Sequence, residues 1–97
     1  MIDLEILRTF IAVVDQGSVV GASRICGFTP SAVSRQMSGF QRRLGVTLFE
    51  PDGRGIRPTP IAYDISARAR LLLEESVSFE AQTFAMCRNA PTARNSS

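Results

Sequence analysis

The first third of the chain carries apolar residues at the spacing of amphipathic helices. Four of them fall on one helical face: Leu4, Leu7, Ile11 and Val14. Asp3 precedes this run as a fair N-cap and Gly17 follows it, so we expect a first helix from Leu4 to Val14.

Two further helices are predicted by their end signals. Ser18 is an N-cap for a short helix, Val19 to Cys26, which Gly27 can end in the left-handed conformation. Thr29 followed by Pro30 then starts a third helix, because proline at the first helical position leaves no N–H unsatisfied. Its apolar side holds four residues at helical spacing, and Gly45 closes it: Val33, Met37, Phe40 and Leu44. Two helices joined by a tight turn outline a helix-turn-helix over about residues 18–38.

A β-hairpin and a long helix are predicted to follow. Residues 46–50 are β-prone, 51–55 carry a turn signal, and 56–58 form a short return strand, which together make a wing. Thr59 and Pro60 repeat the helix-start signal, and no breaker follows until Pro91. We therefore expect a winged helix-turn-helix domain over residues 2–60, a helix over 60–88, and a disordered tail of small and polar residues over 89–97.

The last helix carries an apolar stripe close to a heptad repeat, here called the seam: Ile61, Ile65, Ala69, Leu72, Ser76, Phe79, Thr83 and Met86. A helix of this length cannot pack its whole stripe against so small a domain. We expect a second copy to cover it, with dimer contacts at five seam residues: Ile65, Ala69, Leu72, Ser76 and Phe79. The alternative is a shorter helix folded over its own domain and followed by a frayed tail.

Composition excludes several classes of protein. The chain contains no histidine and two cysteines, Cys26 and Cys87. Most metal sites and the Ser-His-Asp and Cys-His arrangements are therefore excluded, and we expect no catalytic residue, no metal and no cofactor. The longest apolar run, 10–14, is too short to span a bilayer. The first charged residues after Met1 are the acids Asp3 and Glu5, where a signal peptide would be basic. We expect a cytoplasmic protein without a membrane partner.

The positive charge is concentrated in the middle of the chain. Residues 17–58 hold six arginines and two acids, whereas residues 1–16 hold one arginine and three acids. This distribution is typical of a nucleic-acid-binding surface. Judged by charge alone, chance clustering of arginines on a solvated surface explains it equally well.

The outer face of the third helix holds only hydroxyls and guanidinium groups: Ser31, Ser34, Arg35, Ser38 and Arg42. Small residues allow a helix to enter the major groove, and Arg35 could bind guanine O6 and N7 through two hydrogen bonds. Gln36, on the flank, could pair with adenine or hold a phosphate. The alternative is an ordinary polar surface. The acid-free face, the short preceding helix, the tight turn and the wing together favour double-stranded DNA as the partner.

Other residues around this face are candidate DNA contacts. Ser18 and Thr29 stand at helix N-termini, where amides and the helix dipole favour phosphate. Arg54, between two glycines of the wing, could reach an adjacent minor groove. Arg57 is the better candidate for a phosphate contact. Ser38 and Arg42 complete the phosphate-binding set.

The order and spacing of several motifs resemble the N-terminal domain of LysR-type transcriptional regulators over roughly residues 2–75. The matching stretches are Leu4-x-x-Leu7-x-x-Phe10, Gly17-Ser18, Ala22, residues 31–37, Leu44-Gly45-Val46-x-Leu48-Phe49-Glu50, and Thr59-Pro60. The resemblance implies a mainly α, winged helix-turn-helix fold with a linker helix that pairs with its twin in a homodimer. It also implies base contacts at the start of the recognition helix, by Pro30, Ser31, Ser34 and Arg35, and a wing contact by Arg54.

The chain departs from the family pattern at some positions. Pro30 stands where the family often has glutamine, Pro51 where it usually has a basic residue, and Phe40, Cys26 and Ala62 replace other usual residues. Family members also continue into an effector-binding domain, and residues 76–97 show no start of one, so we expect no small-molecule effector site here. Two functions remain open: a dimeric DNA-binding regulator, or a truncated relative that heterodimerises with full-length regulators and inhibits them.

Overall fold

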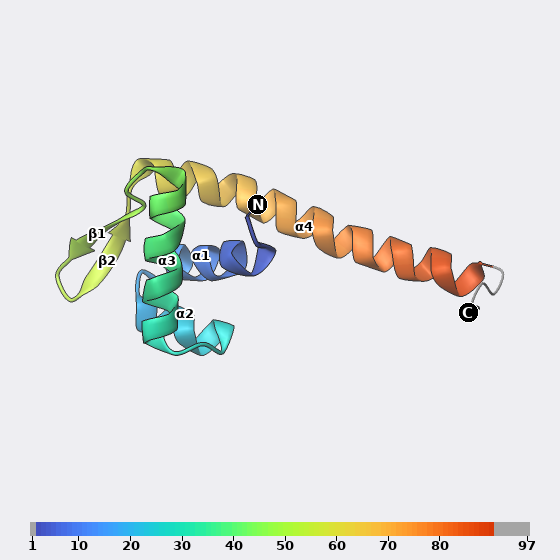
Figure 1. The fold of residues 1–97 in the computed structure, drawn as a ribbon, viewed down its shortest axis with the longest axis horizontal. Helices are drawn as coiled ribbons and strands as arrows, with labels where there is room; N and C mark the ends of the chain where they lie inside the picture. The colour runs from blue at the N-terminus through green and yellow to red at the C-terminus, as the bar shows by residue number, and fades with distance from the viewer. Residues whose placement is uncertain (1, 91–97) are drawn as a thin grey trace.

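The structure, a computed structural model, describes residues 2–90. Its elements in chain order are α1 (Leu4–Gln16), α2 (Val19–Cys26), α3 (Pro30–Leu44), β1 (Phe49–Asp52), β2 (Gly55–Pro58) and α4 (Pro60–Asn89). The first three helices and the hairpin gather at one end, and α4 projects away from them (Figure 1). The predicted mainly α fold with a two-stranded wing is confirmed.

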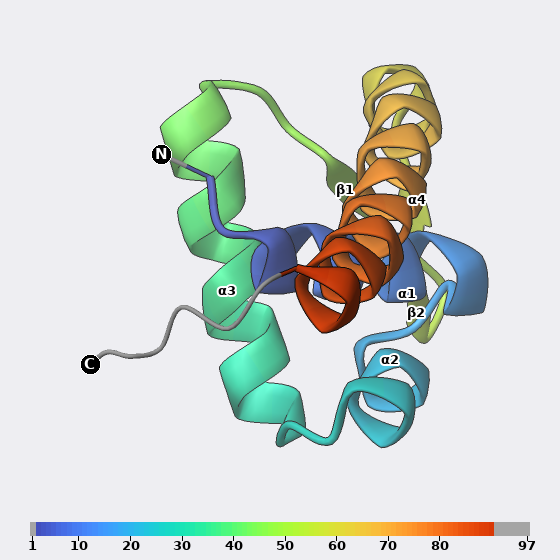
Figure 2. The same cartoon turned by 90° about the vertical axis from the view of Figure 1, so that its right-hand side faces the viewer.

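Side-chain caps place the first three helices where the sequence predicts them. The side chains of Asp3, Ser18 and Thr29 accept hydrogen bonds from the N–H groups of residues 5, 21 and 32 at 2.8, 2.8 and 3.1 Å. Gly27 ends α2 with φ of 77°, a conformation that costs glycine little because it has no Cβ. The chain can therefore turn sharply into Thr29 and lay α3 across α1 and α2 (Figure 2).

The core is built around the fully buried ring of Phe10 on α1. This ring packs edge-to-face against Phe40 of α3 and Phe49 of β1, with centroid distances of 5.3 and 5.8 Å. The recognition helix and the wing thus share one packing partner. The other buried apolar residues are Leu7, Ala12, Val13, Ala22, Val33, Met37, Leu48, Ala62 and Ala69.

The hairpin lies later in the chain than predicted. We expected a strand over residues 46–50, but β1 spans Phe49–Asp52 and pairs antiparallel with β2 from Phe49↔Pro58 to Asp52↔Gly55. The reason is the side chain of Gln41 on α3, whose Oε1 accepts hydrogen bonds from the N–H groups of Leu48 and Phe49 at 2.7 and 3.1 Å. Leu48 is fully buried, so the segment before β1 is held against α3 before the ladder begins.

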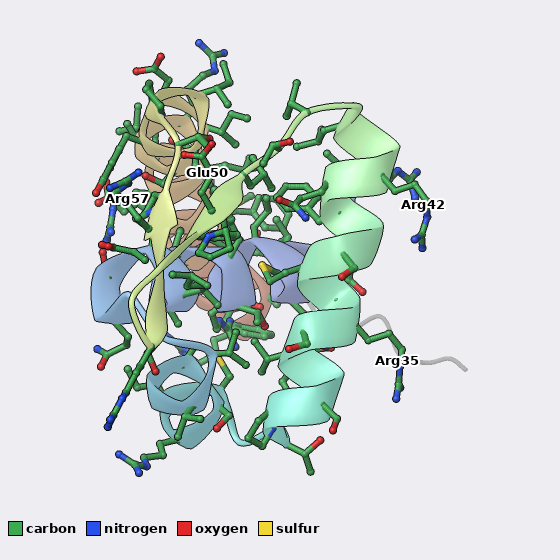
Figure 3. All side chains as sticks on the ribbon, turned by 90° about the vertical axis from the view of Figure 1, so that its left-hand side faces the viewer. Arg35, Arg42, Glu50 and Arg57 are labelled. Atoms are coloured by element: carbon green, nitrogen blue, oxygen red, sulfur yellow. The ribbon has the colours of Figure 1, made fainter. Side chains whose placement is uncertain are left out.

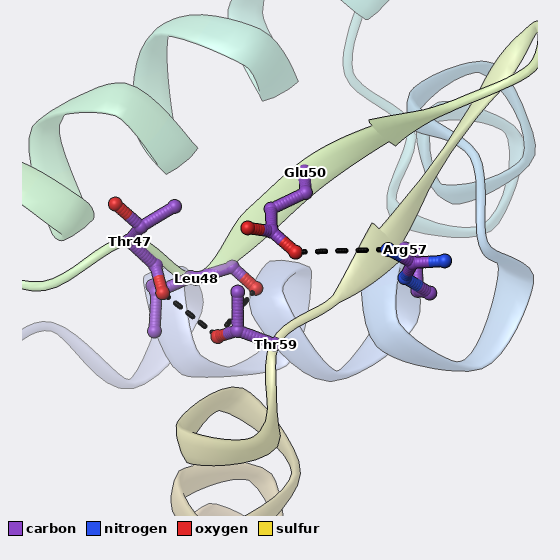
Figure 4. Close-up of polar contacts among 5 residues, drawn as sticks. All are labelled: Thr47, Leu48, Glu50, Arg57 and Thr59. Atoms are coloured by element: carbon purple, nitrogen blue, oxygen red, sulfur yellow. Dashed lines mark hydrogen bonds and ion pairs between the residues drawn. The ribbon is translucent and has the colours of Figure 1, made fainter.

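Thr59 precedes α4 but its hydroxyl does not cap that helix. The Oγ1–H lies 2.7 Å from the carbonyl oxygen of Thr47 and 3.3 Å from that of Leu48, and the Thr59 N–H donates to the same Leu48 oxygen at 2.9 Å (Figure 4). Thr59 therefore ties the start of α4 to the segment that leads into the wing.

Helix α4 has a packed half and a free half. Near its start, Ala62, Ser66 and Ala69 are buried against the domain, and Arg70 forms an ion pair with Asp15 of α1. Beyond this point several large apolar side chains are exposed: Leu71, Leu72, Val77, Phe79, Phe84 and Met86. The helix continues to Asn89, one residue past the predicted end, and the rest of the predicted tail, residues 91–97, lies outside the described residues. No helix within residues 2–90 is long and apolar enough to cross a membrane.

Candidate nucleic-acid interface

The two faces of α3 differ completely in character. One face is buried through Val33, Met37 and Phe40, and these three residues fix the helix against the core. The opposite face is solvent-exposed at every residue that we predicted to lie there: Ser31, Ser34, Arg35, Ser38 and Arg42. Pro30, expected as a base contact from the resemblance, is exposed as well. Arg35 and Arg42 project away from the body of the domain (Figure 3). Because α3 contains no acid, nothing on this face repels a phosphate backbone.

The N-terminus of α3 is open to solvent and suited to an anion. Thr29 is exposed, and its hydroxyl caps the amide of Ala32. Pro30 has no N–H, so the amide of Ser31 is the donor left at the tip of the helix. Arg35 follows one turn later, and Figure 2 shows this end of α3 beside α2. The helix dipole and these donors together favour a negative partner here.

Ser18 stands at the start of α2 in a different setting. Its hydroxyl caps Gly21, and the residue is half-buried. The hairpin lies against the α1–α2 turn at the neighbouring residue, Gly17. The backbone of Gly17 forms this contact: its carbonyl oxygen accepts the Ile56 N–H at 3.4 Å, and a Cβ added to Gly55 would lie 3.0 Å from it. The sequence offered no signal for this contact beyond the two glycines.

The wing carries both of its predicted arginines on the surface. Arg54 is exposed, next to Gly53 at the turn. Arg57 faces its cross-strand neighbour Glu50, with 3.8 Å between Nη2 and Oε1 and both side chains more than half exposed (Figures 3 and 4). An exposed pair of this kind contributes less than about 1 kcal/mol, so Arg57 can exchange Glu50 for a phosphate at low cost.

Two glutamines of α3 lie away from its outer face. Gln36, which we predicted as a phosphate or adenine contact, is half-buried, and its Oε1 is buried without a hydrogen-bond partner among the described residues. Gln41, which sequence reasoning missed, accepts the two amides at the start of the wing. Nothing local in the sequence distinguishes the roles of these two residues, because both depend on what packs beside α3.

The five predicted dimer residues fall into two groups. Ala69 is only 4% exposed and Ile65 is partly buried, so both already pack against their own domain. Leu72 and Phe79 are 50% and 64% exposed, and Ser76, between them, is partly buried. Among these five residues, those still available to a partner therefore begin at Leu72.

The described residues contain no group of three or more His, Cys, Asp or Glu side chains that could hold a metal. Cys26 is partly buried beside the core, and Cys87 is exposed near the end of α4.

The sequence matches a known family over most of the domain. The family is described as "Bacterial regulatory helix-turn-helix protein, lysR family", and its sequence model matches residues 4–63. The chain is 39% identical over 67 residues to the HTH-type transcriptional regulator AbaB of Streptomyces antibioticus, covering 69% of this chain and 22% of AbaB. It is 38% identical over 68 residues to the probable HTH-type transcriptional regulator LtrA of Klebsiella pneumoniae, covering 70% and 22%. The chain thus spans about a fifth of the length of these relatives.

Solved structures with the same architecture include protein–DNA complexes. The CbnR DBD–DNA complex superposes with a TM-score of 0.83 at 28% identity, covering 89% of this chain and 99% of that one. The complex of the BenM DBD with catB site 1 DNA gives a TM-score of 0.86 at 26% identity, covering 93% and 100%. These matches confirm the winged helix-turn-helix fold and the resemblance stated from the sequence.

Proposed function

The chain belongs to the lysR family of bacterial regulatory helix-turn-helix proteins, and on this premise we propose that it binds a specific double-stranded DNA sequence as a homodimer and regulates transcription. The observation that carries the proposal is the exposed, acid-free face of α3. This helix of 15 residues is about 22 Å long, and a major groove about 12 Å wide admits an α-helix. The relatives named as transcriptional regulators support the regulatory role.

In this proposal the first two turns of α3 read the bases. Arg35 binds a guanine through two hydrogen bonds, while Ser31 and Ser34 are small enough to let the helix approach the base edges. Pro30 touches the bases or sugars by apolar contact only, because it has no N–H. All four residues are exposed at the same end of α3.

Phosphate contacts surround this reading face in the proposal. Arg42 and Ser38 lie farther along α3, Thr29 and Ser18 stand at the two helix N-termini, and Arg57 reaches from the wing. Arg54, at the tip of the hairpin, enters an adjacent minor groove. Gln36 is not one of the proposed phosphate contacts because its side-chain oxygen is buried.

The homodimer is supported by the free half of α4. Exposed Leu, Phe and Met side chains recur along a helix that projects from its domain, and an apolar surface of this kind is typical of a protein–protein contact. A second copy offers a matching stripe at the same spacing and holds two copies of α3 at a fixed separation. Since the DNA of a bacterium lies in the cytoplasm, the proposal places the protein there.

Binding to DNA can be tested by selection from random duplexes followed by fluorescence anisotropy at several salt concentrations. The selected sequence should contain two related half-sites, and the affinity should fall steeply as salt rises, since phosphate contacts release counterions. Ser34→Glu should abolish binding, whereas Ala67→Glu, which adds the same charge at an exposed position of α4, should reduce it little. Salt-independent binding, or equal losses in the two variants, would contradict recognition through α3.

A further inference from the structure

A pocket of about 230 Å³ lies between the start of α1 and one flank of α3 (Figure 2). Its apolar wall is formed by Ile2, Ile6 and Phe40, and its polar side belongs to α3 alone. An apolar cavity of about 150 Å³ holds a molecule of benzene, so this pocket has room for one ring with two small substituents.

The polar side of the pocket carries positive charge without an acidic neighbour among the residues that line it. Arg35 and Arg43 stand eight residues apart, which places them on the same flank of the helix, about 12 Å from each other along its axis. Both are exposed, and neither belongs to an ion pair among residues 2–90. The pocket therefore suits an anion. Carboxylate and phosphate both match the fork of a guanidinium group, and the smaller, planar carboxylate leaves more of the volume for an apolar body.

Gly39 lies midway between the two arginines, one turn from each, and also lines the pocket. Glycine is less favourable inside a helix than any residue except proline, so it costs helix stability at this position. Close packing does not require it, because a Cβ added here would meet only Nη2 of Arg42, at an ordinary contact distance of 3.8 Å. What the glycine provides is open space, over which the side chains of Arg35 and Arg43 can lean towards each other.

Gln36 brings an unused hydrogen-bond acceptor to the same pocket. Its Oε1 is buried and has no hydrogen-bond partner among the described residues. Buried polar atoms without a partner are rare because each one lowers stability, and one that belongs to a pocket residue can be satisfied by a molecule bound there. An O–H or N–H group on the bound molecule would supply the missing donor.

We propose that this pocket binds a small carboxylate that has a compact apolar body and one hydrogen-bond donor. The carboxylate lies between Arg35 and Arg43, the apolar body rests against the wall from α1, and the donor reaches Gln36. A few polar groups that orient a ligand in a mostly apolar pocket are the usual pattern of a small-molecule site. The proposal departs from our expectation of no small-molecule site, which concerned a separate effector-binding domain and not the DNA-binding domain itself.

Arg35 links the pocket to DNA binding. This residue borders the pocket, and its side chain projects from the domain on the face proposed to read bases (Figure 3). A guanidinium group held by a carboxylate cannot at the same time bind guanine O6 and N7. The ligand should therefore lower the affinity for the specific duplex. This consequence rests on the DNA binding proposed above, whereas the pocket itself can be tested without DNA.

Heteronuclear NMR titration of the free protein tests the pocket. The probe is para-hydroxyphenylacetate, which carries a carboxylate, one ring and a hydroxyl donor at the opposite end. It should shift the amide signals around the pocket with a dissociation constant on the order of 1 mM, as expected for about eleven non-hydrogen atoms. Phenylacetate, which lacks the donor, should bind about fivefold more weakly, and the corresponding uncharged alcohol at least about tenfold more weakly. Equal binding of the three probes, or no shift around the pocket at roughly 20 mM, would overturn the proposal.

Substitutions in the pocket test its parts one by one. Arg43→Gln should weaken binding of para-hydroxyphenylacetate about tenfold, whereas Arg8→Gln, which removes the same charge at an exposed position outside the pocket, should change it less than about twofold. Gln36→Leu removes the acceptor, so para-hydroxyphenylacetate and phenylacetate should then bind equally. Gly39→Leu should block binding and raise Tm, since leucine is the better helix former. The proposal is wrong if the two arginine substitutions have equal effects, if the preference for the hydroxyl survives Gln36→Leu, or if Gly39→Leu binds the probe as the wild type does.

Fluorescence anisotropy tests the link to DNA. At about ten times its dissociation constant, para-hydroxyphenylacetate should weaken binding to the selected duplex about fivefold or more for each half-site, and sodium acetate at the same concentration is the ionic control. If the probe binds the free protein and leaves this affinity unchanged, Arg35 is not withdrawn from the DNA and the proposed link is wrong. A protein that selects no duplex contradicts the proposed function, and the NMR titration still decides whether the pocket binds a carboxylate.

Discussion

Replacing Arg35 with alanine separates base reading from simple charge attraction. Arg35 is exposed on the outer face of α3, and none of the ion pairs among the described residues includes it. Alanine is also the best helix former, so Arg35→Ala should change the free energy of unfolding by less than about 0.5 kcal/mol. Any loss of DNA binding in this variant then reports on the contact with DNA and not on the fold.

The expected loss depends on the base pair that Arg35 faces. A guanidinium that binds guanine O6 and N7 gives about 1–3 kcal/mol of discrimination, which is about a 5- to 150-fold change in dissociation constant per half-site. The assay is fluorescence anisotropy on the selected duplex and on a duplex in which that one G·C pair is replaced in one half-site. The wild-type protein should distinguish the two duplexes by this factor, and Arg35→Ala should bind both with nearly equal affinity.

Arg42 is the matched control for this substitution. It lies seven residues after Arg35, so it shares the same exposed face but sits about 10 Å farther along the helix axis. Arg42→Ala should weaken binding to both duplexes alike and reduce the steepness of the salt dependence by about 0.9 for each half-site, or about 1.8 for the dimer, because each copy loses one phosphate contact. If Arg35→Ala also weakens both duplexes alike, Arg35 holds a phosphate and the reading role given to it is wrong.

Three other substitutions test the wing and its attachment. Arg54→Ala should weaken binding most on sites with A·T-rich flanks, measured by anisotropy, and equal losses on G·C-rich flanks would indicate plain charge attraction. Glu50→Gln frees Arg57 and removes a negative charge near the DNA, so it should tighten binding a few-fold at low salt; an unchanged or weaker affinity would contradict a phosphate contact by Arg57. Thr59→Val removes the hydroxyl that donates to Thr47, and should cost about 1–2 kcal/mol in urea unfolding and lower Tm by about 4–8 °C per kcal/mol; a cost below about 0.3 kcal/mol would show that water replaces this bond.

The helices could be predicted from the sequence because their limits are set by neighbouring residues. The residues that cap or end α2 and α3 each act within one turn of their helix: Ser18 and Gly27 for α2, and Thr29 and Gly45 for α3. Such interactions are readable in a window of a few residues. The exposed face of α3 could be predicted for the same reason. Once the limits of the helix and its buried side are known, the residues on the opposite side must face solvent.

The wing and the polar side chains beside it could not be placed in the same way. The start of β1 depends on Gln41, seven and eight residues before the amides that it binds. The role of Thr59 depends on carbonyl oxygens eleven and twelve residues earlier in the chain. Local propensity is high at Val46, but the position of a strand is decided by which of its backbone groups are already satisfied elsewhere.

Sequence-specific binding requires that α3 and the wing keep a fixed relation, because contacts with bases tolerate displacements of only about 0.5 Å. In this chain the relation is fixed through α1. Phe10 packs against both Phe40 of α3 and Phe49 of β1, and Asp15, in the last turn of the same helix, pairs with Arg70 of α4. The reading face, the wing and the packed half of α4 therefore move as one body. A change in how two copies of α4 pair would therefore alter the separation and tilt of the two DNA-binding domains and leave each domain intact. The spacing of the half-sites in the DNA should then depend more on the geometry of the α4 pair than on the identity of any residue of α3.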